Sequence, residues 1–142
     1  MDKFKRPVST FAPLQKGKDG KWRVYLQKRA KDAKRKPNNM IGFFGGGIEG
    51  GETPEEALLR EIKEELDYDV KDYHFLGTFE GESVITSRYY AIVPEDFENK
   101  VTILEGQYGK WFTEEEAMRE PLFSERSKKH LEMIFEKISK EV

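Results

Sequence analysis

The sequence predicts an α+β fold in which a mixed β-sheet is layered by helices. Two segments carry helical periodicity, one ending near residue 66 and one near the end of the chain, and the segments between them read as short strands. With 142 residues, 37% of them hydrophobic and 37% charged, the composition is that of a soluble globular protein. This length is enough to bury a core, and we expect a single domain over residues 1–142.

The first strands form a predicted hairpin. Residues 8–14 are an apolar run, residues 17–20 read Gly-Lys-Asp-Gly, and residues 22–26 alternate apolar and polar side chains. Alternation with a period of two, on either side of a glycine-containing turn, is typical of two antiparallel strands. Residues 45–52 follow, and they are so rich in glycine that we expect an irregular loop whose backbone can approach a ligand closely.

A helix is predicted to begin sharply after this loop. Thr53 is an N-cap candidate, Pro54 falls at the first helical position, and Glu56 stands three residues after Thr53, as a capping box requires. On a helical projection, one arc carries the apolar residues and the opposite arc the charged ones. The expected apolar arc is Leu58, Leu59, Ile62 and Leu66, and the expected charged arc is Arg60, Glu61, Glu64 and Glu65.

The rest of the chain predicts further strands at 75–79, 83–93 and 110–112, interrupted by Gly77, Gly81 and Pro94. Ser124 is the expected cap of a last helix, whose apolar stripe is Leu131, Ile134, Phe135 and Ile138.

Three glutamates crowd the charged arc of the first helix. Like charges three or four residues apart repel by roughly 0.2–0.5 kcal/mol per pair, and only Arg60 lies among Glu61, Glu64 and Glu65 to compensate. Carboxylates suit hard divalent ions, which favours Mg²⁺ or Mn²⁺, and a chain with no Cys and two His argues against zinc. The alternative is a solvated acidic face, which a bare E-x-x-E-E pattern would favour.

The complete spacing decides between these alternatives. Gly46, Glu52 and the run from Arg60 to Tyr68 resemble the Nudix box, G-x5-E-x7-R-E-U-x-E-E-x-G-U, where U is a bulky apolar residue, and they match it at every charged position. Two departures stand at the end, Asp67 for glycine and Tyr68 for an aliphatic residue. Because Asp tolerates the left-handed conformation that ends such a helix, we expect the chemistry to survive. The resemblance implies a Nudix fold, an α/β/α sandwich with the box at 46–68.

The resemblance also implies the roles of the box residues. The carboxylates of Glu61, Glu64 and Glu65 would bind the metal ions, joined by the backbone carbonyl of Gly46. Arg60 and Glu52 would form an ion pair that orients the loop and the first of these carboxylates.

A second segment, Glu105-Gly106-Gln107-Tyr108-Gly109-Lys110-Trp111, is similar to the E-G-Q-x-G-x-W sequence of Nudix enzymes that cleave nucleoside triphosphates. It makes Glu105 a candidate metal ligand or general base. Arg29 aligns with a basic residue that meets phosphate in that branch. Among the many aromatic residues, Phe44 and Tyr108 are candidates for stacking a base, against the alternative that they fill the core.

Charge and composition narrow the partners. The formal net charge of −2 gives no general attraction to nucleic acid or membranes, although six of the nine residues in 28–36 are basic. No apolar run is long enough for a signal peptide or a membrane span, so we expect a cytoplasmic protein. The family resemblance implies that its partner is a small-molecule nucleotide. Dimers are common in the family, and a homodimer is left open.

The predicted function is Mg²⁺- or Mn²⁺-dependent hydrolysis of a nucleoside polyphosphate, giving a nucleoside monophosphate and pyrophosphate from a triphosphate. Hydrolysis of ADP-ribose, nucleotide sugars or dinucleoside polyphosphates is the alternative within the class. Family members that cleave ADP-ribose often carry a Pro in the segment corresponding to residues 83–86, and those that cleave dinucleoside polyphosphates often carry a Tyr there. This chain has neither residue in that segment. Arg119, where an amide side chain would suit a purine edge, argues against specificity for oxidised guanine. A Nudix module that binds nucleotide without cleaving it is the alternative from another class.

Overall fold

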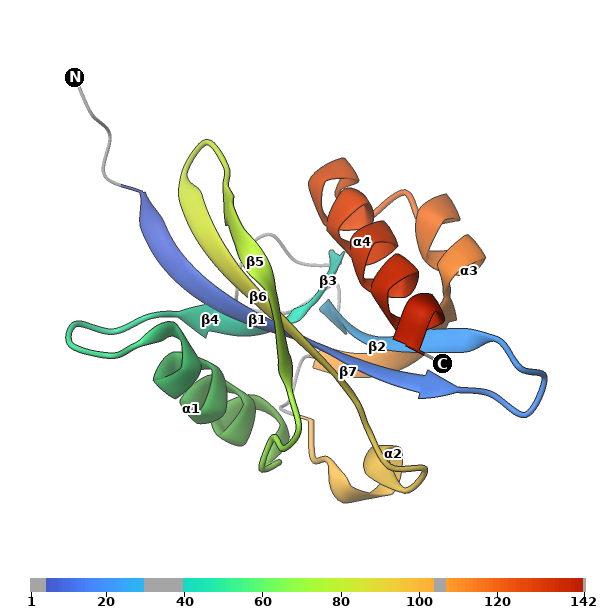
Figure 1. Ribbon diagram of the computed structural model, residues 1–142. Helices are drawn as coiled ribbons and strands as arrows, with labels where there is room; N and C mark the ends of the chain where they lie inside the picture. Colours follow the sequence, from blue (N-terminus) through green and yellow to red (C-terminus); the bar gives the residue numbers. More distant parts are fainter. Residues whose placement is uncertain (1–4, 30–39, 104–106, 142) are drawn as a thin grey trace.

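A computed structural model describes residues 5–29, 40–103 and 107–141, and Figure 1 shows their arrangement. The elements, in chain order, are β1 (Arg6–Lys16), β2 (Trp22–Arg29), β3 (Ile41–Gly42), β4 (Phe44–Gly47), α1 (Pro54–Leu66), β5 (His74–Glu80), β6 (Val84–Ile92), α2 (Phe97–Lys100), β7 (Gln107–Thr113), α3 (Glu114–Arg119) and α4 (Glu125–Glu141). The predicted strands and both predicted helices are present. Among the described residues, β3, β4, α2 and α3 are elements that the sequence pattern did not predict.

Strand β1 organises the mixed sheet. One of its edges pairs in parallel with β6 along nearly its whole length, and the other edge is shared by β4 and β2, both antiparallel. Strand β2 also pairs with β3 and with β7, and β6 pairs with β5, all in the antiparallel sense. The predicted hairpin of β1 and β2 is confirmed, with Lys16 opposite Trp22.

The expectation of an irregular loop over residues 45–52 is wrong for its first part. Gly45, Gly46 and Gly47 are paired with Thr10, Ser9 and Val8 of β1, so the glycines form a strand. Local glycine content disfavours a strand, but a neighbouring strand with free backbone groups supplies the hydrogen bonds that override this tendency. Only the following residues form the turn that leads into α1.

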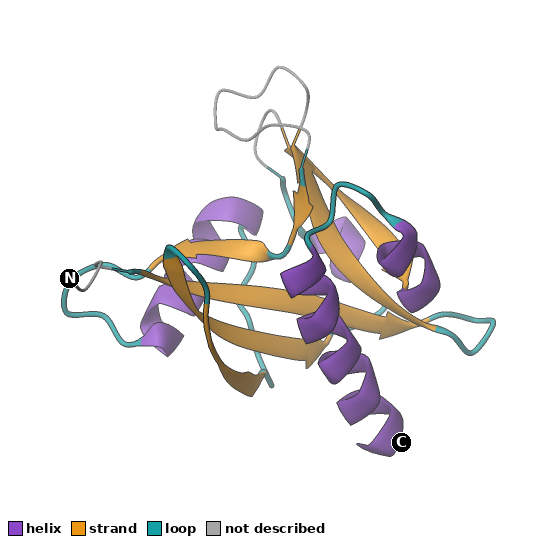
Figure 2. Ribbon diagram, turned by 90° about the horizontal axis from the view of Figure 1, so that it is seen from above, coloured by secondary structure: helices purple, strands orange, loops and turns teal. Residues whose placement is uncertain are grey.

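Helices cover both faces of the sheet, as the ribbon shows from two directions (Figures 1 and 2). Alternate residues of β2 point to the two faces, so Val24 and Leu26 pack in one buried cluster and Tyr25 in the other. The first cluster includes Leu131, Ile134, Phe135 and Ile138 of α4, and the second includes Leu58, Ile62 and Leu66 of α1. This arrangement confirms the predicted α+β sandwich.

Helix α1 begins and ends as its sequence predicts. Thr53 and Glu56 form a reciprocal capping box, Pro54 opens the helix, and Asp67 closes it in the left-handed conformation at φ 50°. The predicted apolar arc was too wide on one side, because Leu59 is 40% exposed. On the other side Glu65 is buried, because a residue seven positions from Leu58 lies only about 20° away from it on the projection.

Helix α4 begins after Ser124, whose hydroxyl oxygen accepts a hydrogen bond from the Ser127 N–H at 3.1 Å, so the predicted cap is confirmed. None of the helices in the described part of the chain has the length and apolar character needed to cross a membrane.

Candidate active site

Strand β4 and helix α1 bring the box residues together. The turn between them is short, and Ser9 of β1 fixes the start of the helix, because its buried hydroxyl donates a hydrogen bond to the Pro54 carbonyl at 2.7 Å. The register of β4 on β1 then sets which glycine faces the charged side of α1. The site is therefore built on two regular elements anchored to the centre of the sheet.

At two glycines of β4 the backbone lies so close to neighbouring atoms that a side chain would not fit. A Cβ at Gly46 would lie 2.5 Å from the carboxylate carbon of Glu61, closer than any real Cβ contact. At Gly45, where φ is +139°, a Cβ would lie 2.1 Å from the Ser9 carbonyl oxygen. The box glycine therefore leaves room for the first glutamate of E-x-x-E-E directly against the strand.

Arg60 joins the loop to the helix. Its guanidinium donates two hydrogen bonds to the Glu52 carboxylate at 2.7 and 2.9 Å, and a third to the Gly47 carbonyl at 3.0 Å. The remaining nitrogen, Nη1, donates to Glu61 at 3.0 Å and more weakly to Glu64 at 3.4 Å. The hydrogen bond from Arg60 lowers the pKa of Glu52 to about 2 and raises that of Arg60, so both stay charged over the whole physiological range.

The three glutamates on α1 have different environments. Glu65 is 6% exposed, and its Oε1 accepts a hydrogen bond from the Gly45 N–H at 2.8 Å. The Glu61 side chain is largely covered by Arg60 and Gly46, whereas the Glu64 side chain is 60% exposed. Arg60 therefore holds Glu61 and, more weakly, Glu64, whereas the Gly45 N–H holds Glu65. Glu64 is the carboxylate with most freedom to move.

The chemistry of these donors fits a divalent cation. Four acidic residues, Glu49, Glu52, Glu61 and Glu64, lie within 4 Å of Arg60, and Glu65 is on the same helix, so the region carries an excess negative charge. Because Gly46 has no side chain, its backbone and the Glu61 carboxylate lie next to each other. Within the described ranges, no three acidic or histidine side chains yet converge on one point, because Glu61 and Glu64 turn to Arg60 and Glu65 to Gly45.

Two other predicted site residues, Arg29 and Tyr108, lie at the end of β2 and the start of β7. These strands are antiparallel neighbours, with Arg29 opposite Gln107 and Lys28 opposite Tyr108. The Tyr108 ring is 43% exposed, and the Lys28 Nζ lies 6.0 Å from its centre. The pairing of β2 with β7 thus brings Arg29 and Tyr108, which are far apart in sequence, to the same edge of the sheet. Glu105 lies outside the described residues.

Phe44 corrects a prediction. Its side chain is fully buried and stacks on the Tyr25 ring at 5.7 Å, so it has no surface to offer a substrate. Tyr25 in turn lies beneath Gly109, where a Cβ would come within 2.2 Å of its ring. The alternation of β4 places Phe44 in the core between the sheet and α1, which bears out the alternative that this residue fills the core.

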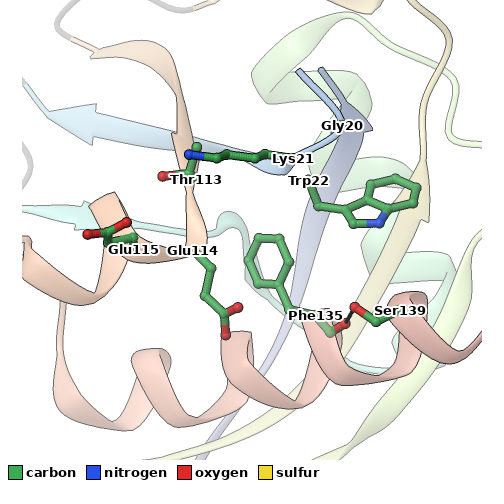
Figure 3. Close-up of a pocket in the computed structure, with 8 residues that line it drawn as sticks. All are labelled: Gly20, Lys21, Trp22, Thr113, Glu114, Glu115, Phe135 and Ser139. Carbon is green, nitrogen blue, oxygen red and sulfur yellow. Dashed lines mark hydrogen bonds between the residues drawn. The ribbon is translucent and has the colours of Figure 1, made fainter. Parts of the chain in front are cut away.

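A separate cavity of about 360 Å³ lies between the β1–β2 turn, the start of α3 and helix α4 (Figure 3). Its lining includes Lys21, Trp22, Glu114, Phe135 and Ser139. None of the predicted site residues contributes to it, so the cavity gives no support to the predicted chemistry.

The sequence matches the model of the NUDIX domain over residues 5–133, which include the whole site described above. The chain belongs to the Nudix family. It is similar to the 8-oxo-dGTP diphosphatase of Escherichia coli (strain K12), with 33% identity over 93 residues, or 63% of this chain and 69% of that protein. It is also similar to the RNA pyrophosphohydrolase of Marinomonas sp. (strain MWYL1), with 38% identity over 80 residues, or 56% of this chain and 47% of that protein.

Solved structures agree on the Nudix fold. A mutT/nudix family protein from Listeria innocua superposes with a TM-score of 0.79 at 21% identity, covering 98% of each chain. A MutT NUDIX hydrolase from Burkholderia pseudomallei gives 0.70 at 24% identity, covering 93% of this chain and 99% of that one. The family match and the names of the curated relatives bear out the predicted class of enzyme, a Nudix pyrophosphohydrolase.

Proposed function

We propose that this Nudix protein is a divalent-metal-dependent hydrolase of nucleoside polyphosphates, with a nucleoside triphosphate as its substrate and a nucleoside monophosphate and pyrophosphate as its products. The observation that carries the proposal is the contact between the Glu61 carboxylate and the Gly46 backbone, locked by the Arg60–Glu52 ion pair. A solvated acidic helix face would need neither the glycine nor the arginine clamp.

The metal ligands proposed are the carboxylates of Glu61, Glu64 and Glu65 with the Gly46 carbonyl, and the ions would be Mg²⁺ or Mn²⁺. When bound, such ions neutralise phosphate charge and lower the pKa of a water nucleophile. Arg60 holds Glu61 in position by its hydrogen bond and prevents the loop from moving away from the helix. The Glu61 carboxylate is therefore held beside the Gly46 backbone.

Two further residues complete the proposed site. Arg29, at the end of β2, would hold the phosphate tail, and Tyr108, on the neighbouring strand β7, would contact the substrate. The proton of the attacking water would pass to a box glutamate or to Glu105. The E-G-Q-x-G-x-W sequence around Glu105 and the name of the Escherichia coli relative support a triphosphate over a nucleotide sugar.

The test is a hydrolysis panel in Mg²⁺ and in Mn²⁺ with separated products. It contains normal and oxidised nucleoside triphosphates, ADP-ribose, nucleotide sugars, dinucleoside polyphosphates and an oligoribonucleotide with a 5′-triphosphate, the last because one relative is named for RNA. We expect one triphosphate to yield its monophosphate and pyrophosphate. We expect Glu64→Gln to lower kcat by at least about a hundredfold, a loss of roughly 2.7 kcal/mol of transition-state stabilisation.

Glu55→Gln is the matched control. It makes the same chemical change on the same helix, six residues before Glu61, where Glu55 accepts a hydrogen bond from the Tyr73 hydroxyl that glutamine can keep. Turnover by Glu64→Gln within tenfold of wild type would refute the metal assignment. Cleavage of a sugar, dinucleotide or RNA substrate alone would refute the triphosphate, and binding without cleavage would favour a recognition module. The single domain, the cytoplasmic location and the homodimer stay predictions.

A further inference from the structure

Gln27 is a buried polar residue that the proposed mechanism does not use. It lies in β2, is 6% exposed, and donates one hydrogen bond from Nε2 to the Phe43 carbonyl at 3.0 Å. This bond fixes which way the amide points, because a carbonyl can only accept. The other end, Oε1, is also buried and accepts no hydrogen bond from the described residues.

A buried acceptor without a donor destabilises the fold, so natural structures rarely keep one without a reason. A cavity of about 130 Å³ lies beside this residue, and its lining is Gln27, Met40, Ile41, Gly42 and Phe43. The buried hydroxyl of Ser9, by contrast, donates a hydrogen bond to the Pro54 carbonyl. The unsatisfied acceptor and the cavity therefore occur at the same place.

The cavity is next to the proposed active site. Phe43 directly precedes β4, the strand whose glycines contact Glu61 and Glu65, and Gln27 stands two residues before Arg29 in β2. Gln27 is also paired in register with Gly42 of β3 and Gly109 of β7. A nucleotide whose phosphates lie at the box would have its nucleoside within reach of these strands.

We propose that Gln27 determines base selectivity, with Oε1 accepting a hydrogen bond from a ring or exocyclic N–H of the nucleobase. This inference rests on the proposed function for its choice of ligand. The lining combines the Gln27 amide with Met40 and Ile41, so polar and apolar groups share the cavity, and a base, which has polar edges and flat apolar faces, suits this mixture. A site with one buried acceptor discriminates against an analogue that lacks the matching donor, because the acceptor then stays unpaired.

The experiment compares wild type with Gln27→Met, which keeps the length of the side chain and removes both polar atoms. Substrate pairs differ by one donor: guanosine against inosine triphosphate, adenosine against purine-riboside triphosphate, and each ribonucleotide against its 2′-deoxy form. We expect wild type to prefer the member of one base pair with the extra donor by at least about tenfold in kcat/KM. In Gln27→Met this preference should fall to threefold or less through KM, with kcat nearly unchanged.

Gln15→Met is the matched control. Gln15 lies on the neighbouring strand β1 and likewise donates from Nε2 to a backbone carbonyl, that of Pro94, but it does not line the cavity. Its replacement should leave the base preference as in wild type. Unchanged selectivity in Gln27→Met, with only its unfolding free energy altered, would overturn the proposal and indicate that water satisfies Oε1. Discrimination confined to the 2′-hydroxyl pairs would also overturn it.

A binding measurement separates this inference from the proposed function. The side-chain amide signals of Gln27, assigned by their loss in Gln27→Met, are followed by NMR while nucleoside monophosphates are added in the presence of EDTA. We expect the signals to shift with one base and not with the others, whether or not the protein cleaves triphosphates. Signals that stay in place with every base would refute the role of Gln27 and leave the hydrolysis result untouched.

Discussion

Replacement of Gly46 by alanine tests the geometry of the site directly. The new Cβ would lie 2.5 Å from the carboxylate carbon of Glu61, whereas an ordinary contact begins at 3.4 Å, so the carboxylate must retreat by about 1 Å. Because the obstructing atoms are the far end of a flexible side chain, the backbone need not move. A displacement of about 1 Å in a catalytic group can cost about a hundredfold in rate.

We therefore expect Gly46→Ala to lose at least about a hundredfold in kcat while its free energy of unfolding changes by less than about 1 kcal/mol. The small stability change reflects opposing effects, since alanine reduces the entropy of the unfolded chain and crowds the folded one. Gly50→Ala is the matched control, because a Cβ at Gly50 meets no atom within 4 Å. The assays are steady-state hydrolysis and urea unfolding. Full activity of Gly46→Ala, alongside an inactive Glu61→Gln variant, would refute the reasoning.

Three more changes have calculable outcomes. Arg60→Lys should lower kcat by at least about tenfold in the same hydrolysis assay, because one ammonium cannot make the paired bonds to Glu52 and the bond to the Gly47 carbonyl; activity equal to wild type would contradict this. Thr53→Ala should cost about 1 kcal/mol in urea unfolding through loss of the helix cap, and Thr53→Ser should restore it. Acidification should destabilise the fold through protonation of His130 in the unfolded chain.

His130 is buried, and its Nδ1 accepts a hydrogen bond from Arg88 at 2.6 Å. Burial, with added repulsion from Arg88 and Arg126, lowers the pKa of His130 to about 4. The unfolded chain, with a histidine pKa near 6.5, binds the proton first, so this contribution to stability is complete above about pH 6.5 and declines as the pH falls toward 4. The loss should approach roughly 3 kcal/mol. Unfolding of wild type and His130→Gln across pH 4–7 checks this, and parallel curves would contradict it.

Much of the site could be predicted from local sequence because its spacing is fixed by a helix. Arg60, Glu61, Glu64 and Glu65 stand at set angles once Thr53 starts the helix, and the box therefore reads as one charged region. The same angles place Glu65 beside the buried Leu58, so its burial also follows from the helix geometry, although we predicted it on the charged arc. Leu59 shows the opposite error, since an apolar residue at the edge of the arc remains exposed where the helix meets no further layer.

Other features depended on contacts between distant segments. The glycines of β4 form a strand only because β1 offers its free edge, and Phe44 then becomes a core residue instead of a substrate contact. The unsatisfied Gln27 acceptor is likewise invisible in the sequence, since its burial depends on β3 and on the Phe43 carbonyl. No local pattern around these residues specifies their long-range partners.

The helix, its caps and the spacing of its charges follow from residues within one or two turns of each other, and membership of the Nudix family follows from the fixed spacing of residues 46–68. The tertiary structure alone decided that Gly46 lies against Glu61, that Phe44 is buried, and that the ends of β2 and β7 lie side by side. The physical reason is that local hydrogen bonds and side-chain spacing are encoded along the chain. Strand pairing and close packing are set by free energy shared among segments that meet only in the folded protein.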